Sequence, residues 1–454
     1  MKYSDIEELL NRAEIEHQSG NYLLSDKLCN EILVLNSLNI ETNDAITFRS
    51  RAFHLLSSSL LSQRKTAQAL DTAQKSLDLA IQSKNKQLEA NVLMNIGRIY
   101  NSQYEYLSAL EYFNKALILY QKLDRKIDVI NTLGVIGVLY EDQSEFPLAM
   151  EFYRKSLELA EELNIEKYMA WNFAHIGNVY MSISDYSNAL DFYSKSLTID
   201  ERLNLQENVS RTVANIGIVY YYLSDINRSL EYSLRALAIN EKLNRKEGIA
   251  ANFGSIGIAY DSLSDYPKAL EYYFKSLSVS EELDNQVTIA RNYGNIGTTY
   301  LNIGNYSLAL EYLQKAVSIN KKLERIDSII VNLSNIGSVY ATVDFSGYSP
   351  EKAEEYLFNA INLAEVIDEK HSIFNNHKIL ANLYEHEGEI TKALYHYKEY
   401  YTLESHVKSE DAVHQAELME SRRKIEESER DRQIKLARYQ EQEKILHNIL
   451  PSQI

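Results

Sequence analysis

The chain is poor in the residues that interrupt helices, since its 454 residues include only 4 prolines and 15 glycines. Sheets need frequent tight turns and disordered chains are enriched in both residues, so this composition argues against both. The single cysteine, Cys29, excludes an internal disulfide framework and fits a reducing compartment. The amino terminus has no apolar signal segment, and no apolar run approaches the length of a membrane span. We therefore expect a soluble, cytoplasmic protein with no membrane span.

Basic residues are also in deficit, and the formal net charge is −17. An acidic surface repels both the phosphate backbone of nucleic acid and anionic lipid headgroups, so we expect neither as a partner. A chain of 454 residues is too long for one simple core. Its length predicts several domains or an extended repeat array.

The sequence also lacks the patterns that mark catalytic and metal sites. Its glycines are dispersed instead of forming a phosphate-binding loop, no nucleophile motif is present, and Cys29 has no recognisable histidine partner. Four histidines near the carboxyl end, His371, His377, His386 and His396, are separated by 6, 9 and 10 residues, which match no helical metal-ligand spacing. We expect no catalytic residues, no cofactor and no metal in this chain.

What the sequence does contain is a repeat with a period of 40 residues. A glycine recurs at this spacing, a tyrosine follows three residues later, and a small residue stands nine residues beyond the tyrosine. These positions are Gly97, Gly137, Gly177, Gly217, Gly257, Gly297 and Gly337; Tyr100, Tyr140, Tyr180, Tyr220, Tyr260, Tyr300 and Tyr340; and Ala109, Ala149, Ala189, Ser229, Ala269 and Ala309. Repetition at a fixed period predicts identical structural units that stack on one another.

Each repeat reads as two helices joined by a short polar turn, with the glycine in the first helix and the small residue in the second. Glycine costs up to about 1 kcal/mol in a helix, so its recurrence at one phase needs a structural reason. We predict that the missing Cβ lets the second helix of the same repeat approach the first closely. Each pair leaves apolar edges that only a neighbouring pair can cover, which predicts an all-α solenoid.

This pattern resembles the tetratricopeptide repeat, in the form about 40 residues long found in bacterial sensor proteins and kinesin light chains. The resemblance implies a right-handed superhelical solenoid of helix-turn-helix repeats, whose first helices line a concave surface that takes an extended peptide or a partner helix. We count ten repeats, with a capping repeat at residues 1–43 and the remaining array at residues 44–405. The ninth repeat carries a four-residue insertion between Tyr340 and Ala353.

The concave surface offers a row of amides and a mid-array apolar patch. The candidate groove residues are Asn95, Arg98, Val138, Trp171, Asn178, Met181, Arg211, Asn215, Ile218, Tyr221, Ile258, Arg291, Asn295 and Asn335. Asparagine carries a donor and an acceptor and can bind peptide backbone whatever its side chains; alternatively, these amides are solvated or bridge adjacent first helices. Trp171 is either an aromatic anchor for a ligand or part of the packing between neighbouring repeats.

Beyond the array, no glycine or proline stands between Tyr401 and Pro451, which predicts one helix from about Leu403 to Leu450. A heptad stripe favours a homodimer through a coiled coil of residues 406–450, with a solvated single helix as the alternative. The stripe is formed by Leu418, Ile425, Tyr439 and Leu446, with Leu436 and Leu450 in the companion phase. Arg432 interrupts this stripe.

The last residues, "KILHNILPSQI", resemble the junction before the catalytic domain of bacterial class III nucleotidyl cyclases. The matching residues are Leu446, Asn448, Ile449, Leu450, Pro451 and Ile454. The resemblance implies a regulatory module for an adenylate or guanylate cyclase, with residues 451–454 beginning the linker to a catalytic domain outside this sequence. A non-enzymatic adaptor or scaffold, and the sensor region of a histidine kinase or phosphatase, are the alternatives.

Overall fold

The computed structural model describes residues 3–35 and 42–449, and every regular element among them is an α-helix. The all-α prediction is therefore confirmed. The chain divides into two compact units, residues 1–179 and residues 180–454, and α9 crosses the division.

The first unit contains α1 (Tyr3–Gln18), α2 (Tyr22–Leu33), α3 (Asn43–Ser62), α4 (Thr66–Gln82), α5 (Lys86–Ser102), α6 (Tyr106–Lys122), α7 (Lys126–Asp142), α8 (Phe146–Glu162) and most of α9 (Glu166–Ser182). The second contains α10 (Tyr186–Arg202), α11 (Gln206–Tyr222), α12 (Ile226–Lys242), α13 (Lys246–Ser262), α14 (Tyr266–Glu282), α15 (Gln286–Ile303), α16 (Tyr306–Lys322), α17 (Ile326–Tyr340), α18 (Pro350–Val366), α19 (Lys370–His386) and α20 (Ile390–Ile449).

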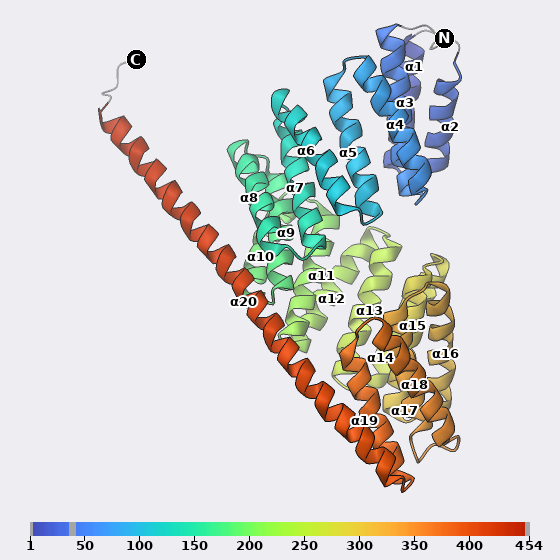
Figure 1. The fold of residues 1–454 in the computed structure, drawn as a ribbon. Helices are drawn as coiled ribbons and strands as arrows, with labels where there is room; N and C mark the ends of the chain where they lie inside the picture. Colours follow the sequence, from blue (N-terminus) through green and yellow to red (C-terminus); the bar gives the residue numbers. More distant parts are fainter. Residues whose placement is uncertain (1–2, 36–41, 450–454) are drawn as a thin grey trace. The chain divides into compact units, whose positions relative to one another are not determined.

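Successive helices form the expected helix-turn-helix pairs, which follow one another along the chain within each unit (Figure 1). In the first unit the pairs run from α1–α2 to α7–α8, and in the second from α11–α12 to α19–α20. Most of the turns place one residue in the left-handed region, as Ser184 (φ 58°) and Gly304 (φ 84°) do. The next amide then bonds back to the helix, as Asp185 does to the Tyr180 carbonyl at 2.8 Å. This geometry ends one helix and starts the next within about four residues.

The repeated glycines lie where the two helices of a pair approach most closely, which confirms the packing prediction. A Cβ built on Gly257 would lie 2.6 Å from ring atoms of Tyr273 on the second helix. The same clash occurs between Gly137 and Tyr153 at 2.5 Å. Ala269, on the second helix of the same pair as Gly257, is fully buried. The Gly–Ala phase therefore fixes the distance between the two helices of a repeat.

The repeated tyrosines form a ladder of stacked rings along the pairs. Each packs on an aromatic ring of the second helix with centroids 5.4–5.8 Å apart, as between Tyr220 and Tyr232 at 5.4 Å. A lysine often covers the second ring and pairs with a glutamate one turn earlier, as Lys315 does with Tyr312 and Glu311. These rings are thus held by contacts inside each repeat.

Two irregularities interrupt the period. The predicted insertion is present as a longer connection between α17 and α18, over residues 341–349. The long helix was predicted to begin near Leu403, but α20 begins at Ile390 and is 60 residues long, or about 90 Å. The second helix of the tenth pair runs into the tail because nothing in between ends it. No helix in the described part of the chain has the length and apolar character needed to cross a bilayer.

Candidate functional site

Two of the predicted asparagines bridge neighbouring first helices. Asn95 on α5 is 3% exposed, and its amide donates to the Ser57 hydroxyl of α3 at 2.9 Å. Asn335 on α17 donates to the Thr298 hydroxyl of α15 at 3.0 Å. At these positions the structure shows the bridging alternative. Asn178 and Asn215 are half-buried and interact with other groups of the chain.

Asn295 lies in a different setting, because it lines an open hollow of about 380 Å³ within the second unit. Its lining residues from α15 and α16 are Val287, Ala290, Arg291, Gly294, Asn295, Thr298 and Asn320; those that follow along the chain are Arg325, Asp327, Ser328, Val331, Asn332, Glu369 and Ser372. Gly294 lets the Asn332 side chain approach α15 closely, since a Cβ there would lie 3.0 Å from the Asn332 amide oxygen. Beside Asn295 the lining of the hollow therefore has no side chain at residue 294.

The charges around this hollow leave one cation available. Arg325 pairs with Asp327 at 3.4 Å, and Glu369 accepts a hydrogen bond from the Ser372 amide at 2.7 Å, which caps α19. No carboxylate among the described residues lies within ion-pair distance of Arg291, whose side chain is exposed. Val331 presents an apolar surface beside these groups and is 54% exposed. A free guanidinium, an amide and an apolar surface together suit an extended peptide that carries an acidic group.

The first unit has a second polar hollow, around Arg98 of α5. Its volume is about 250 Å³, and its lining includes Arg98, His54, Asn91, Asn131 and Asp128. The Asp128 carboxylate pairs with Arg125 at 2.8 Å, while Arg98 has no acidic partner among the described residues. Burial lowers the pKa of His54 to about 4, so this imidazole is neutral at pH 7. Its Nδ1 atom is buried without a hydrogen-bond partner.

Trp171 packs between neighbouring repeats of the first unit. A Cβ built on Gly134 of α7 would lie 2.6 Å from the indole, so the ring rests directly on that backbone. The indole also lies 4.0 Å from the His175 ring and 5.9 Å from the Tyr153 ring, measured between centroids. Trp171 is partly exposed, so its edge remains accessible at the surface. Its main contacts are nevertheless those of a packing residue.

The remaining predicted groove residues differ in their exposure. Ile218 and Ile258 occupy the same phase of adjacent repeats and are 38% and 36% exposed. Val138 of the first unit, and Met181 and Tyr221 of the second, are half-buried. Arg211 is exposed.

Sequence reasoning did not predict a contact between two histidines, one on α19 and one on α20. His377 and His396 lie 19 residues apart, and their Nδ1 atoms meet at 2.8 Å in a buried position. Burial lowers the pKa of both, that of His396 to about 4. One neutral ring donates to the other, which is a structural contact. In the described part of the chain, no group of three or more potential ligands is placed to hold a metal.

The predicted dimer helix is only partly described. Leu418 is 7% and Ile425 is 1% exposed, and both are covered within this single chain. The side chains of Leu436, Tyr439 and Leu446, and the whole of Leu450, lie outside the described residues. Between Leu418 and Ile425, the Arg422 guanidinium donates two hydrogen bonds to the backbone carbonyl of Ile183, at 2.8 and 2.6 Å.

Comparison with known families identifies the repeats. A tetratricopeptide repeat family matches residues 88–162, 205–282 and 248–322, and a second tetratricopeptide repeat family matches residues 173–202. The chain therefore contains tetratricopeptide repeats, as the sequence predicted. A comparison with curated proteins finds none that matches the chain.

Solved structures share the fold at low identity. A signal-transduction ATPase with numerous domains and a tetratricopeptide repeat sensor, from Pyrococcus horikoshii, has a TM-score of 0.59 and 17% identity, over 80% of this chain and 54% of that one. The chain thus spans about half of that protein. A Rap protein in complex with competence and sporulation factor has a TM-score of 0.50 and 14% identity. The match covers 90% of this chain and 99% of the Rap protein. The apo form of RapI has a TM-score of 0.50 and 18% identity, and the match covers 62% of this chain and 99% of RapI.

Proposed function

We propose that this array of tetratricopeptide repeats binds an extended peptide or protein segment, and that its ligand state passes through α20 to a C-terminal class III nucleotidyl cyclase. The observation that carries the binding proposal is the hollow between α15 and α17, where Arg291 and Asn295 face open space. Two similar folds, one described as a sensor and one solved with competence and sporulation factor, support a ligand-binding role.

The hollow suggests how the ligand is held. The Asn295 amide offers one donor and one acceptor, which match the two polar groups of an extended backbone residue. Arg291 supplies a cation for an acidic group on the same ligand, and its planar guanidinium favours a carboxylate in a two-bond geometry. The exposed Val331 side chain packs against an apolar side chain of the ligand. We therefore expect a ligand with an acidic residue next to an apolar one.

Binding is tested by selecting from a displayed library of random twelve-residue peptides, followed by affinity measurements on the best binder. Arg291→Ala should weaken binding at least tenfold, because it removes a hydrogen-bonded charge, and Asn295→Ala about fivefold. Arg235→Ala is the matched control, since Arg235 lies on the second helix α12 and pairs with Glu201. Selection of no binder, or equal losses for Arg291→Ala and Arg235→Ala, would refute this part of the proposal.

The cyclase part rests on the sequence resemblance of the last residues to a cyclase junction. Class III cyclases resemble one another in forming active sites between two catalytic domains, so a regulatory helix that pairs two chains in parallel would control the rate. The test is to purify the complete protein encoded by the parent gene and to measure its turnover of ATP and GTP. A parent protein without a cyclase domain after Ile454 would exclude this part and favour the adaptor or kinase-sensor alternatives.

A further inference from the structure

One turn of the repeat array is covered where its equivalents are open. Ile183 occupies the turn between α9 and α10 and is fully buried, 0% exposed. The equivalent apolar residues of the next four repeats are much more exposed: Leu223 47%, Leu263 45%, Ile303 44% and Val343 50%. Tyr180 differs in the same way, since it is 3% exposed while the other six tyrosines of its phase are only half-buried. Something covers this one turn.

The covering element is α20, which comes from the far end of the sequence. The two Arg422 hydrogen bonds to the Ile183 carbonyl join residues 239 positions apart. That carbonyl lies at the carboxyl end of α9, where unpaired carbonyls and the helix dipole create negative potential. A guanidinium with two parallel donors is well suited to such a site.

The helix face that makes this contact is narrow and well defined. Leu418, Arg422 and Ile425 stand at i, i+4 and i+7, which places them on one side of α20. Leu418 and Ile425 are buried, whereas Met419, next to Leu418, is 64% exposed. Val413, nearer the repeats along the chain, is 57% exposed, although Val407 before it is only 4% exposed. Glu410 still pairs with Lys370 of α19, so the helix leaves the repeats after Glu410 and contacts them again at residues 418–425.

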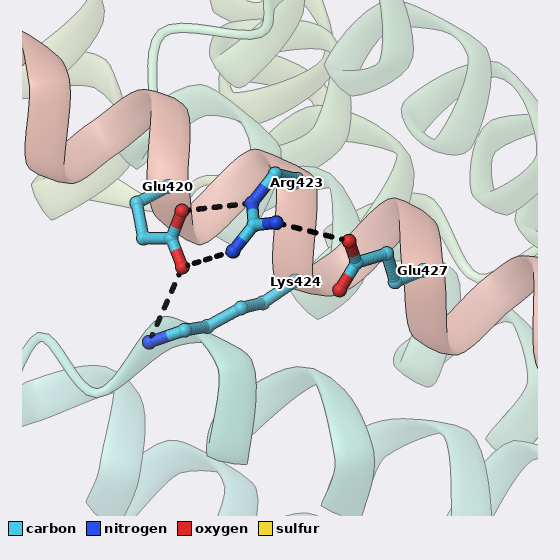
Figure 2. Close-up of polar contacts among 4 residues, drawn as sticks. All are labelled: Glu420, Arg423, Lys424 and Glu427. Carbon is cyan, nitrogen blue, oxygen red and sulfur yellow. Dashed lines mark hydrogen bonds and ion pairs between the residues drawn. The ribbon is translucent and has the colours of Figure 1, made fainter.

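The opposite face of α20 carries a separate network of charges (Figure 2). Arg423 donates to Glu420 at 2.8 Å and to Glu427 at 3.3 Å, and Lys424 lies 3.9 Å from Glu420. These side chains are exposed and belong to the helix alone. Adjacent arginines thus have different surroundings: Arg422 bonds to the α9–α10 turn, and Arg423 bonds only within α20.

We infer that the turn formed by Tyr180 and Ile183 is a docking surface for residues 418–425 of α20, and that this docking competes with pairing of two chains through the same face. Leu418 and Ile425 are also the described members of the predicted heptad stripe. One helix face cannot cover Ile183 and a second copy of α20 at the same time. The pairing of two chains through α20 rests on the proposed function, whereas the docking of α20 on this turn does not.

The two states differ in what they expose. In the docked state α20 hides its apolar face and leaves the chain a monomer. In the released state the face from Leu418 to Ile425 becomes free for a second copy, and Ile183 becomes as open as its equivalents. Because Arg422 makes the polar part of the docking contact and has no place in an apolar seam, its removal should favour release.

The test compares Arg422→Ala with Arg423→Ala in the full chain, a pair matched in residue type and helix position. Hydrogen exchange of the segments around residues 180–185 and 413–427 reports docking, and sedimentation velocity reports association. Arg422→Ala should raise exchange in both segments at least tenfold and increase the dimer fraction at equal concentration. Arg423→Ala should leave the exchange of residues 180–185 at its original rate.

Leu418→Glu separates the two steps, because it removes apolar contact from both the docked face and the seam. It should raise exchange as Arg422→Ala does, without increasing the dimer fraction. Unchanged exchange around Ile183 in both variants would overturn the docking surface. Raised exchange with no increase in dimer for Arg422→Ala would overturn the competition. Peptide affinity at Arg291 is measured separately, so failure of the proposed ligand site is distinguishable from either result.

Discussion

Two glycines on α13, three residues apart, test whether close helix packing sets the repeat geometry. A Cβ on Gly257 would lie 2.6 Å from Tyr273, a distance at which the ring or the helix has to move. A Cβ on Gly254 would meet only the Ser276 hydroxyl at 3.8 Å, which is an ordinary contact. The two sites share a helix and a residue type, so they differ chiefly in the space around the added methyl group.

The magnitudes follow from two opposing effects. Replacing glycine by alanine inside a helix stabilises it by about 0.8–1 kcal/mol, and Gly254→Ala should show this gain. Overpacking a well-filled interior costs about 1–3 kcal/mol, so Gly257→Ala should be destabilised by up to about 2 kcal/mol after the same gain. The expected difference between the variants is about 1–3 kcal/mol.

The assay is hydrogen exchange of α13 and α14 in the full chain, together with urea unfolding followed by circular dichroism. Exchange reports the local free energy of opening, which is needed because a repeat array need not unfold in one step. Gly257→Ala should exchange faster than the unmodified protein, and Gly254→Ala more slowly. If Gly257→Ala were as stable as Gly254→Ala, close approach at the repeated glycine would not be what fixes the pair.

Three further outcomes are expected. Because burial lowers the pKa values of both His377 and His396 in the folded chain, the unfolded chain binds protons first as the pH falls. Stability of α19–α20, measured by hydrogen exchange, should therefore fall by about 1–2 kcal/mol between pH 6.5 and 5, and by less in a His396→Phe variant. Asn95→Ala should lower stability by about 1 kcal/mol, since it removes a donor from the buried Ser57, and should leave peptide affinity unchanged. Purified protein of this sequence should not convert ATP or GTP to a cyclic nucleotide with Mg²⁺ or Mn²⁺ present, and turnover that copurifies with the chain would contradict this.

The repeat architecture could be predicted because one set of contacts recurs. Gly257 and Tyr260 repeat every 40 residues, so each copy reports the same packing, and seven copies leave little ambiguity about the helix pairs. The start of α20 was misplaced for a related reason. Loss of the repeat pattern near residue 405 shows that the helix stops packing as a repeat helix there. The helix itself continues, because no glycine or proline occurs between Ile390 and Ile449.

The contacts outside the period could not be predicted. The Asn95 partner is Ser57, which stands at the glycine phase of a divergent repeat, so only the structure shows that this amide bridges two helices. Trp171 was equally compatible with a ligand and with packing until its position over Gly134 was known. Arg422 and Ile183 are 239 residues apart, and neither belongs to a sequence motif that would mark it as a contact residue. Contacts between residues so far apart depend on the path of the chain in three dimensions, which cannot be predicted from the residue pattern of a single sequence.

The most direct test of the central claim is to locate a selected peptide on the repeats by photo-cross-linking, with a benzophenone side chain placed beside its acidic residue. Mass spectrometry of the cross-linked fragments should place the peptide on the first helices that line the hollow, within residues 287–298 of α15 and 326–332 of α17. Arg291→Ala should reduce the yield at least tenfold, and Arg235→Ala should not. Cross-links confined to the second helices, such as α12 with its Arg235, would contradict the account.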